Sequence, residues 1–217
     1  MPDWTANVLE GELVRLEPLE SRHEQDLWDA SRDERTWRWL SVVQPRTREE
    51  LRAWLDAALE SEDLAFATVL RETGSAVGST RFLSQRPEHA SIEIGWTWLA
   101  PAAWGTGANI EAKLLMLEDA FERLGCRRVE LKTDALNERS RHALEALPAH
   151  FEGIHRKHML VRGGENRDSA WYSVVDDEWP AVRANLLRRL RLGGSSDSTS
   201  ETKLGGAGGY PERLRRK

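Results

Sequence analysis

Two glycines in the segment PAAWGTGAN, residues 101–109, stand between a predicted strand and a predicted helix. Gly105 and Gly107 allow the backbone to approach a ligand closely, because no Cβ atom is in the way. The first turn of the following helix leaves backbone N–H groups unpaired at the positive end of the helix dipole. Such a turn suits a diphosphate, although an ordinary tight connection would have the same sequence.

Two common phosphate-binding motifs are excluded by the residues that follow. A dinucleotide fingerprint, G-x-G-x-x-G, needs a third glycine where this chain has Ile110. A P-loop needs Gly-Lys-Ser or Gly-Lys-Thr, and neither follows the two glycines. The sequence therefore predicts an anion site of another kind.

The elements that position this turn are predicted from periodicity. Ser91–Leu99 alternates as a strand does and is closed by Pro101, and a helical period then runs from Thr106 until Gly125 ends it. The other predicted strands are Gly11–Leu19, Leu64–Arg71, Ala76–Leu83, Arg127–Thr133, His150–Val161 and Ser169–Val175. The other predicted helices are Ser21–Asp33 with Ser21 as its N-cap, one beginning at Thr47 with a capping box to Glu50, Asn137–Leu147 and Asp176–Leu192. Three consecutive strands before the long helix predict an α/β (α+β) fold with a mixed sheet of about seven strands and about four to five helices.

The composition is that of an ordinary globular protein of 217 residues, 40% hydrophobic and 31% charged. A net charge of −5 argues against nucleic acid as a partner, and no apolar run approaches the roughly 18 residues of a membrane span. The single cysteine, Cys126, and the lack of a signal pattern favour the cytoplasm. A shift to Gly, Ser and Thr predicts a domain over residues 1–192 and a disordered tail with a basic end over 193–217.

Five segments, in order, resemble the GNAT superfamily of N-acetyltransferases, in the branch that includes the ribosomal-protein N-acetyltransferases. They are GELVRLEPL (11–19), SIEIGWTWLAPAAWGTGANIEAKLL (91–115), LGCRRVELKTDALNERSRHALEAL (124–147), FEGIHRKHML (151–160) and WYSVVDDEW (171–179). The resemblance implies the GNAT fold and an acyl-coenzyme A-dependent N-acyltransferase. It further implies acetyl-coenzyme A as cofactor, an amine as acceptor and no metal.

The resemblance also implies a splayed pair of parallel strands, Ser91–Leu99 and Arg127–Thr133, with the cofactor arm bonded between them as an added strand would be. The implied cofactor contacts are Trp98, Leu99, Trp104, Gly105, Thr106, Gly107, Ala108, Asn109, Asn137 and Ser140. Asn137 also fits the N-cap of the next helix, and both roles are compatible. The side chains expected either to meet the 3′-phosphate or to face water are Lys113, Arg139 and Arg141.

Two catalytic roles follow from the resemblance. Ser140 matches a hydroxyl near the thioester sulfur, where it would protonate the leaving thiolate, although it also fits a capping hydroxyl. Glu93 is the candidate base for the amine, with a structural ion pair as its alternative. A bulge at Gly95–Thr97 is expected to aim an N–H at the thioester carbonyl. Direct transfer is expected, because Cys126 lies near no motif for a covalent nucleophile.

The sequence departs from the family pattern at two positions. Ala102 replaces the Gln or Arg that stands three residues before the first glycine in the pyrophosphate motif. Met159 replaces a second candidate base, so the neighbouring His158 remains open as a base beside Glu93. These departures favour an alternative in which the chain binds acyl-coenzyme A without catalysis, as a sensor or scaffold.

The acceptor side is expected from the first two helices, the loop between them and the last strands. The predicted acceptor contacts are Trp37, Trp39, Trp96 and His158, and the tryptophans among them have core packing as their alternative. The acceptor is either a protein N-terminus or a small molecule of the antibiotic type. In the second case the acyl donor could carry a chain longer than acetyl. The last strands and exposed tryptophans favour a homodimer.

Overall fold

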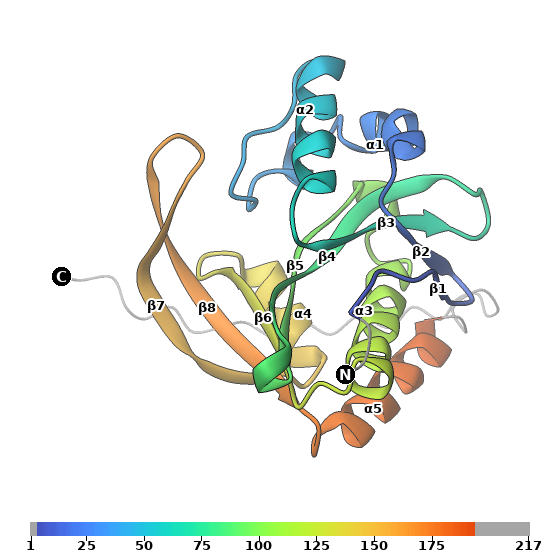
Figure 1. Ribbon diagram of the computed structural model, residues 1–217, viewed down its shortest axis with the longest axis vertical. Coiled ribbons are helices and arrows are strands. Elements are labelled where there is room, and N and C mark those ends of the chain that lie inside the picture. The colour runs from blue at the N-terminus through green and yellow to red at the C-terminus, as the bar shows by residue number, and fades with distance from the viewer. Residues whose placement is uncertain (1–3, 194–217) are drawn as a thin grey trace, which may run out of the picture.

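The computed structural model describes residues 4–193, which form one mixed sheet with helices on both faces (Figure 1). Its strands are β1 (Leu9–Glu10), β2 (Val14–Pro18), β3 (Leu64–Leu70), β4 (Ala76–Arg86), β5 (Ser91–Leu99), β6 (Arg128–Asp134), β7 (His150–Val161) and β8 (Glu165–Val175). Its α-helices are α1 (Glu24–Ala30), α2 (Arg48–Leu59), α3 (Ala108–Glu118), α4 (Glu138–Ala146) and α5 (Trp179–Gly193). The predicted tail lies outside the described residues, apart from Gly193.

Strand order in the described sheet is β1-β2-β3-β4-β5-β6-β8-β7. Within it β5 and β6 are parallel, whereas the other neighbours are antiparallel. The mixed sheet confirms the predicted fold class. No helix among the described residues is long and apolar enough to cross a membrane.

Several element boundaries differ from the prediction, among them those of the first strand, the first helix and the last strand. The first predicted strand is two strands, because a turn separates Leu9–Glu10 from Val14–Pro18. Ser21 is not an N-cap: Glu20 caps a short 3₁₀ turn, through a capping box with His23, and α1 begins only after it. Strand β8 begins at Glu165, four residues earlier than predicted.

Other local signals are confirmed. Thr47 caps α2, since its hydroxyl accepts a hydrogen bond from the Glu50 amide at 3.2 Å and the Glu50 carboxylate reaches back to the Thr47 amide. Helix α3 continues into a π-helical turn at Asp119–Arg123. The chain then leaves the helix at Gly125, whose φ of 68° favours glycine.

The alternation of β3 divides the core between the two faces of the sheet. Phe66 joins a cluster with α3, α4 and α5, whereas Ala65 and Ala67 join a second cluster beneath α1 and α2. Figure 1 accordingly shows α1 and α2 together above the sheet, and α3 beside α5 below it. The site described next lies between these two layers.

Glu111 of α3 fixes the turn between β1 and β2. Its buried carboxylate accepts hydrogen bonds from the amides of Glu12, Leu13 and Val14 at 2.8, 2.7 and 2.6 Å. A Cβ atom on Gly11 would lie 2.5 Å from this carboxyl group, so the approach requires glycine. The first strands are therefore anchored to the helix that follows the glycine turn.

Replacement of Glu111 by alanine is expected to lower the free energy of unfolding by roughly 3 kcal/mol, because three backbone amides lose the buried carboxylate that accepts their hydrogen bonds. The matched control is Glu118→Ala on the same helix, which breaks a surface pair with Arg183 and is expected to cost less than about 1 kcal/mol. Urea unfolding of both variants measures the difference. Equal midpoints would contradict the anchoring role of Glu111.

Candidate active site

The parallel strands β5 and β6 pair only along their first halves. Their register runs from Ser91 opposite Arg128 to Ile94 opposite Leu131, and no pairing between them follows. Beyond this point β6 remains paired with β8, and β5 with β4. The expected splayed pair is therefore present in the described sheet.

A bulge in β5 turns the strand where the divergence begins. Gly95 lies opposite Arg81 and Trp98 lies opposite Ser79, so Trp96 and Thr97 together face one residue of β4. Trp96 has a φ of 50°, a conformation that a bulky side chain rarely adopts. The bulge predicted at Gly95–Thr97 is confirmed, and the strain marks the middle of the site.

A cavity of about 400 Å³ lies where the two strands diverge. It is lined by β5, β6, α3 and α4, by the loop before α2 and by the β7–β8 hairpin. Among the predicted site residues it gathers Trp39, Glu93, Trp96, Trp98, Leu99, Trp104, Gly105, Asn109, Asn137 and Ser140. Thr106, Gly107 and Ala108 are adjacent to it in the chain but do not line it.

The glycine turn has the backbone conformation that its sequence predicts. Gly105 and Gly107 have φ values of 78° and 90°, and a Cβ atom on Gly107 would meet Leu13 at 2.9 Å. The amides of Gly105, Thr106 and Gly107 make no hydrogen bond to another described residue. Three donors thus stand unpaired just before the N-terminus of α3, as an anion site requires.

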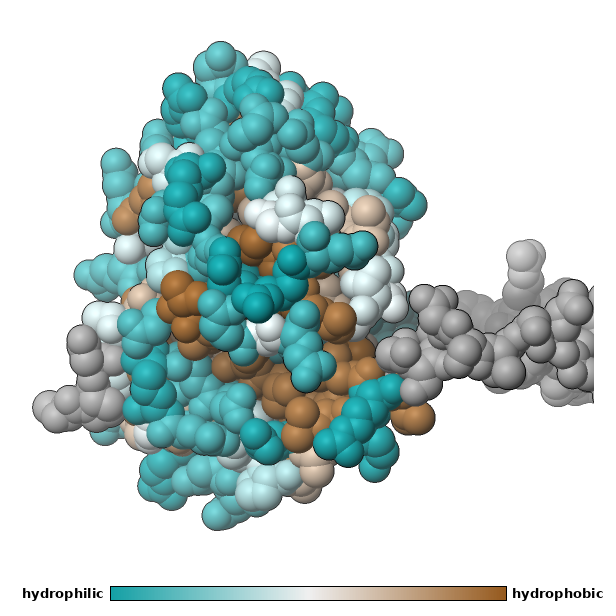
Figure 2. All heavy atoms as spheres, turned by 90° about the vertical axis from the view of Figure 1, so that its right-hand side faces the viewer, coloured by the Kyte–Doolittle hydropathy of each residue, from teal (hydrophilic) through white to brown (hydrophobic). Residues whose placement is uncertain are grey.

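Apolar side chains pack against one residue of this turn, Gly107. Leu13 and Leu190 both lie within 4 Å of the position that a Cβ atom of Gly107 would take. Figure 2 views the molecule from the side where β1, α3 and α5 lie, and an apolar area is visible there among polar side chains. Gly105 and Thr106 are exposed, so a ligand in the cavity can extend past the turn into solvent.

The cavity is strongly cationic. Its charged lining residues are one carboxylate, Glu93, and five cations, Lys113, Lys132, Arg139, Arg167 and Arg189. The Arg139 guanidinium stacks over the Trp104 ring at 3.7 Å beside the glycine turn, whereas Arg141 bonds to Tyr172 and Ala135 and does not line the cavity. This excess of positive charge beside unpaired amides fits an anionic cofactor such as coenzyme A.

Ser140 and Asn137 lie together at the start of α4. The Asn137 side chain accepts a hydrogen bond from the Ser140 amide at 3.2 Å, so Asn137 is the N-cap and also lines the cavity. The Ser140 hydroxyl makes no hydrogen bond to another described residue. Its proton is therefore available to a ligand in the cavity.

Glu93 is 1% exposed and forms an ion pair with Lys132 at 2.8 Å. Only Oε2 takes part, with a long contact to the Ser84 hydroxyl, while the buried Oε1 has no partner. Burial raises the pKa of Glu93, and Lys132 acts in the opposite direction. The ion-pair alternative is thus present, and it leaves one carboxylate oxygen free for a proton.

Lys113 does not face water. It is 8% exposed, and its ammonium donates to the Thr97 hydroxyl at 2.7 Å, on the bulged part of β5. No acidic side chain among the described residues forms an ion pair with it. Burial therefore lowers the pKa of Lys113 to about 7.

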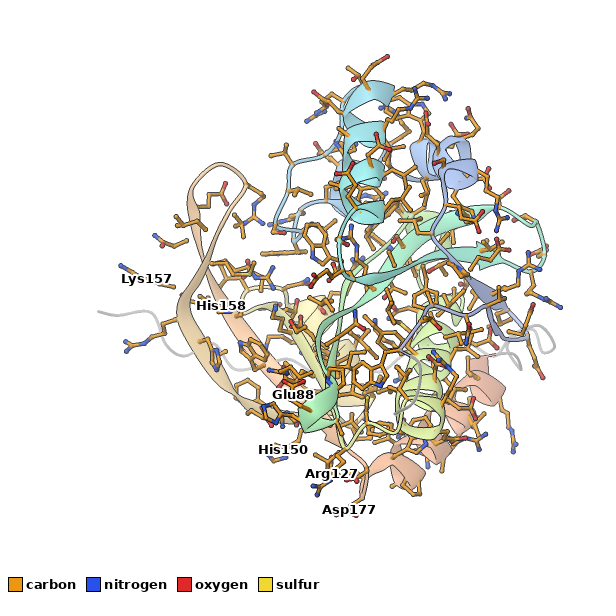
Figure 3. The ribbon with its side chains drawn as sticks, in the orientation of Figure 1. Glu88, Arg127, His150, Lys157, His158 and Asp177 are labelled. Atoms are coloured by element: carbon orange, nitrogen blue, oxygen red, sulfur yellow. The ribbon has the colours of Figure 1, made fainter. Side chains whose placement is uncertain are left out.

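Two predicted acceptor contacts, Trp37 and His158, and the single cysteine lie away from the cavity. Trp37 is 2% exposed and packs in the core, with ring centroids 5.2 Å from Trp98 and 6.1 Å from Trp54, so the geometry favours its packing alternative. His158 bonds to Ser169 and lies on the β7–β8 hairpin, well to the side of α3 (Figure 3). Cys126 is buried, and burial raises the pKa of its thiol to about 12, which disfavours a thiolate nucleophile.

The sequence did not single out Lys132 or Arg167, and it left Lys113 without a defined position. Arg167 precedes the predicted start of the last strand, so no alternation pointed to it. Lys132 follows the alternation of β6, in which Val129 and Leu131 point to the core. This pattern could have predicted that the Lys132 side chain lies on the other face of the sheet. The burial of Lys113 depends on β5, and a helical pattern alone does not reveal it.

Lys113 predicts a pH dependence of stability. Between pH 7 and about 10.5 the unfolded chain holds a proton on Lys113 that the folded protein lacks, so rising pH stabilises the fold. Lys113→Met removes this dependence. Its free energy of unfolding is expected to exceed that of the unmodified protein by on the order of a few kcal/mol at pH 6, and by little near pH 10. Denaturant unfolding at both pH values measures the gain.

Lys157→Met is the control for this experiment, because Lys157 points outward from β7 (Figure 3) and is exposed. It is expected to change stability by the same small amount at both pH values. A gain from Lys113→Met that does not depend on pH would contradict the burial of a titrating ammonium.

Comparisons with known proteins agree with this geometry. A family model described as an acetyltransferase (GNAT) domain matches residues 14–149. The chain is 37% identical to a GCN5-related N-acetyltransferase from Brucella melitensis, with a TM-score of 0.81, over 87% of this chain and 90% of that chain. It is 40% identical to a protein of known structure from T. thermophilus, with a TM-score of 0.80, over 88% and 100% of the two chains.

More distant relatives share less of the sequence. The uncharacterized N-acetyltransferase p20 of Bacillus licheniformis is 29% identical over 108 residues, and the match spans 50% of this chain and 60% of that relative. The ribosomal L7/L12 alpha-N-protein acetyltransferase RimL is similar in fold, at 16% identity and a TM-score of 0.68, over 78% and 94% of the two chains. The family model covers more than half of the chain, over the splayed strands, the glycine turn and the start of α4, and the chain belongs to the GNAT acetyltransferase family.

Proposed function

We propose that this chain transfers an acetyl group from acetyl-coenzyme A to a primary amine, directly between the two bound substrates. The observation that carries the proposal is the opening of β5 from β6 beyond Ile94 and Leu131, into a cationic cavity beside the glycine turn. The unpaired amides at Gly105 and Gly107 are the proposed diphosphate contacts. Acetyl-coenzyme A, when bound, supplies an acetyl group on a thioester.

The residues of this chain supply the two proton transfers that the reaction requires. One proton must leave the amine, and Glu93 Oε1 is the proposed acceptor, because it is buried, unpaired and on the cavity wall. One proton must reach the departing sulfur, and the Ser140 hydroxyl is the proposed donor. An amide of the bulge at Trp96–Thr97 is the proposed donor to the thioester oxygen, a contact worth roughly 3 kcal/mol.

His158 is the weaker candidate for the base. Burial lowers the pKa of His158, and the positive charge of Lys132 acts in the same direction, which favours the neutral ring. It does not line the cavity, however, and its Nδ1 is engaged with Ser169. Glu93 therefore carries this role in the proposal.

The acceptor class, the location and the assembly are finer parts of the proposal. A protein N-terminus and a small amine are both acceptors compatible with the family. The single cysteine is in keeping with the cytoplasm. The edge strand β7 exposes Phe151 and Ile154, which supports a homodimer that sedimentation at micromolar concentration would detect.

The test of the function is a titration of the purified protein with acetyl-coenzyme A, followed by thiol release with a panel of amines. Binding with release supports the transferase. Binding without release for any amine would instead favour an acyl-coenzyme A sensor. The absence of both would overturn the cofactor assignment.

Ser140→Ala is expected to lower kcat on the order of 100-fold, because the departing sulfur loses its proton donor. Its thermal stability is expected to stay unchanged, since the Ser140 hydroxyl makes no hydrogen bond within the described structure. Ser61→Ala, at the end of α2 and away from the cavity, is the control. Full turnover by Ser140→Ala would remove Ser140 from the proposed mechanism.

A further inference from the structure

The cavity is lined by residues from both faces of the sheet, and the two faces differ in character. Ile94, Leu131 and Tyr172 point to the core beneath α3, α4 and α5. The residues that alternate with them on β5, β6 and β8 lie on the opposite face and include Glu93, Lys132 and Arg167. The glycine turn and Ser140 belong to the face of α3 and α4, so the cofactor side and the Arg167 side are separated by the sheet.

Arg167 is a buried guanidinium without a partner. It is 8% exposed and lines the cavity, and its side chain makes no hydrogen bond or ion pair with any described residue. Arg81, which is also buried, differs because it pairs with Asp63 at 3.2 Å and stacks over the Trp96 ring. A buried charge without a counter-ion is costly, so Arg167 is arranged for an anion that the chain itself does not supply.

The neighbouring groups restrict which anion this is. The carboxylate of Asp134 is near enough to act on Arg167 electrostatically but forms no ion pair with it, and Glu93 acts on it in the same way. Glu93 Oε1, the proposed proton acceptor for the amine, is free on the same face. This face therefore presents a carboxylate that can accept a proton from an ammonium group, beside a guanidinium that can donate hydrogen bonds to an anion.

We infer that Arg167 binds a carboxylate of the acceptor, so that the acceptor is a small amino acid-type molecule with a primary amine and a carboxylate. A guanidinium matches a carboxylate through two parallel hydrogen bonds, which also fixes the direction of the amine. The inference rests on the proposed function, since Glu93 is taken to receive the amine proton. It adds the chemical class of the acceptor.

The walls of this side favour a small acceptor over the N-terminus of a folded protein. The loop before α2 contributes Leu40 and Ser41 to the cavity, and the hairpin contributes Met159 and Arg167. Arg162 joins the two walls, because its amide donates to the Ser41 carbonyl at 2.9 Å and its guanidinium donates to the Leu40 carbonyl at 2.7 Å. The loop and the hairpin therefore enclose the Arg167 side together.

The experiment compares acceptors that differ only in the carboxylate. The proteinogenic amino acids, their amides and their decarboxylated amines are each offered with acetyl-coenzyme A, and thiol release gives kcat/KM. The unmodified protein is expected to prefer the best carboxylate-bearing acceptor over its amide on the order of 100-fold. Arg167→Met is expected to reduce this ratio to near one by raising KM for the acceptor, and Arg167→Lys to retain part of it.

The matched control is Arg139→Met, which removes an arginine from the cofactor side of the same cavity. It is expected to weaken acetyl-coenzyme A binding in calorimetry and to leave the carboxylate preference intact, whereas Arg167→Met does the reverse. No preference in the unmodified protein, or an unchanged preference in both Arg167 variants, would overturn the inference. Faster turnover of peptide N-termini than of every amino acid would also overturn it and assign a protein acceptor.

These results separate the inference from the proposed function. If acetyl-coenzyme A releases its thiol equally well with amines that carry a carboxylate and amines that do not, the inference is contradicted and the transferase remains intact. Binding of acetyl-coenzyme A without release for any amine contradicts both. The comparison of acceptors by the unmodified protein does not depend on the folding of any variant.

Discussion

The separation of β5 from β6 is the constraint on which the rest of the structure depends. A parallel pair in the middle of a sheet normally continues its hydrogen bonds to the strand ends, because unpaired backbone groups inside a protein are costly. Here pairing stops at Ile94 and Leu131, and the bulge at Trp96 turns β5 away. The cavity between the strands leaves these backbone groups to a ligand, and the glycine turn lies at the end of the same strand.

The charges around this opening oppose stability and favour ligands. Lys113 on one side of the sheet and Arg167 on the other are both buried without an acidic partner. A fold selected for stability alone would pair such groups or replace them with apolar ones. Their cost is offset by the two helical layers and by anchors such as Glu111, which holds three backbone amides of the first turn. Stability and function are therefore divided between different parts of the molecule.

The sequence was sufficient for most signals that lie within one element, although the N-cap predicted at Ser21 was wrong. The capping box at Thr47, the strand Ser91–Leu99 and the turn at Gly105 and Gly107 depend on neighbouring residues, and each was predicted correctly. The positions of Trp37, Lys113 and Arg167 depend on which elements pack together. Trp37 and Trp39 are only two residues apart, yet they have different environments. The fold buries Trp37 against Trp54 and leaves Trp39 on the cavity wall. Periodicity predicts which face of a helix or strand a residue lies on, but it does not predict which other element packs against that face.

The two-sided cavity also explains why a covalent step within the protein is unnecessary. The proposed cofactor contacts come from the glycine turn before α3 and from the start of α4, and the proposed acceptor contacts come from the opposite face of β5, β6 and β8. A gap in the sheet is the one place where groups bound on the two faces can meet, since elsewhere paired strands separate them. The single cysteine is buried in the core and has a raised pKa, so it cannot relay an acyl group. The topology therefore supports the proposed direct transfer, since the opening proposed to admit the cofactor would also be the place where the amine reaches it.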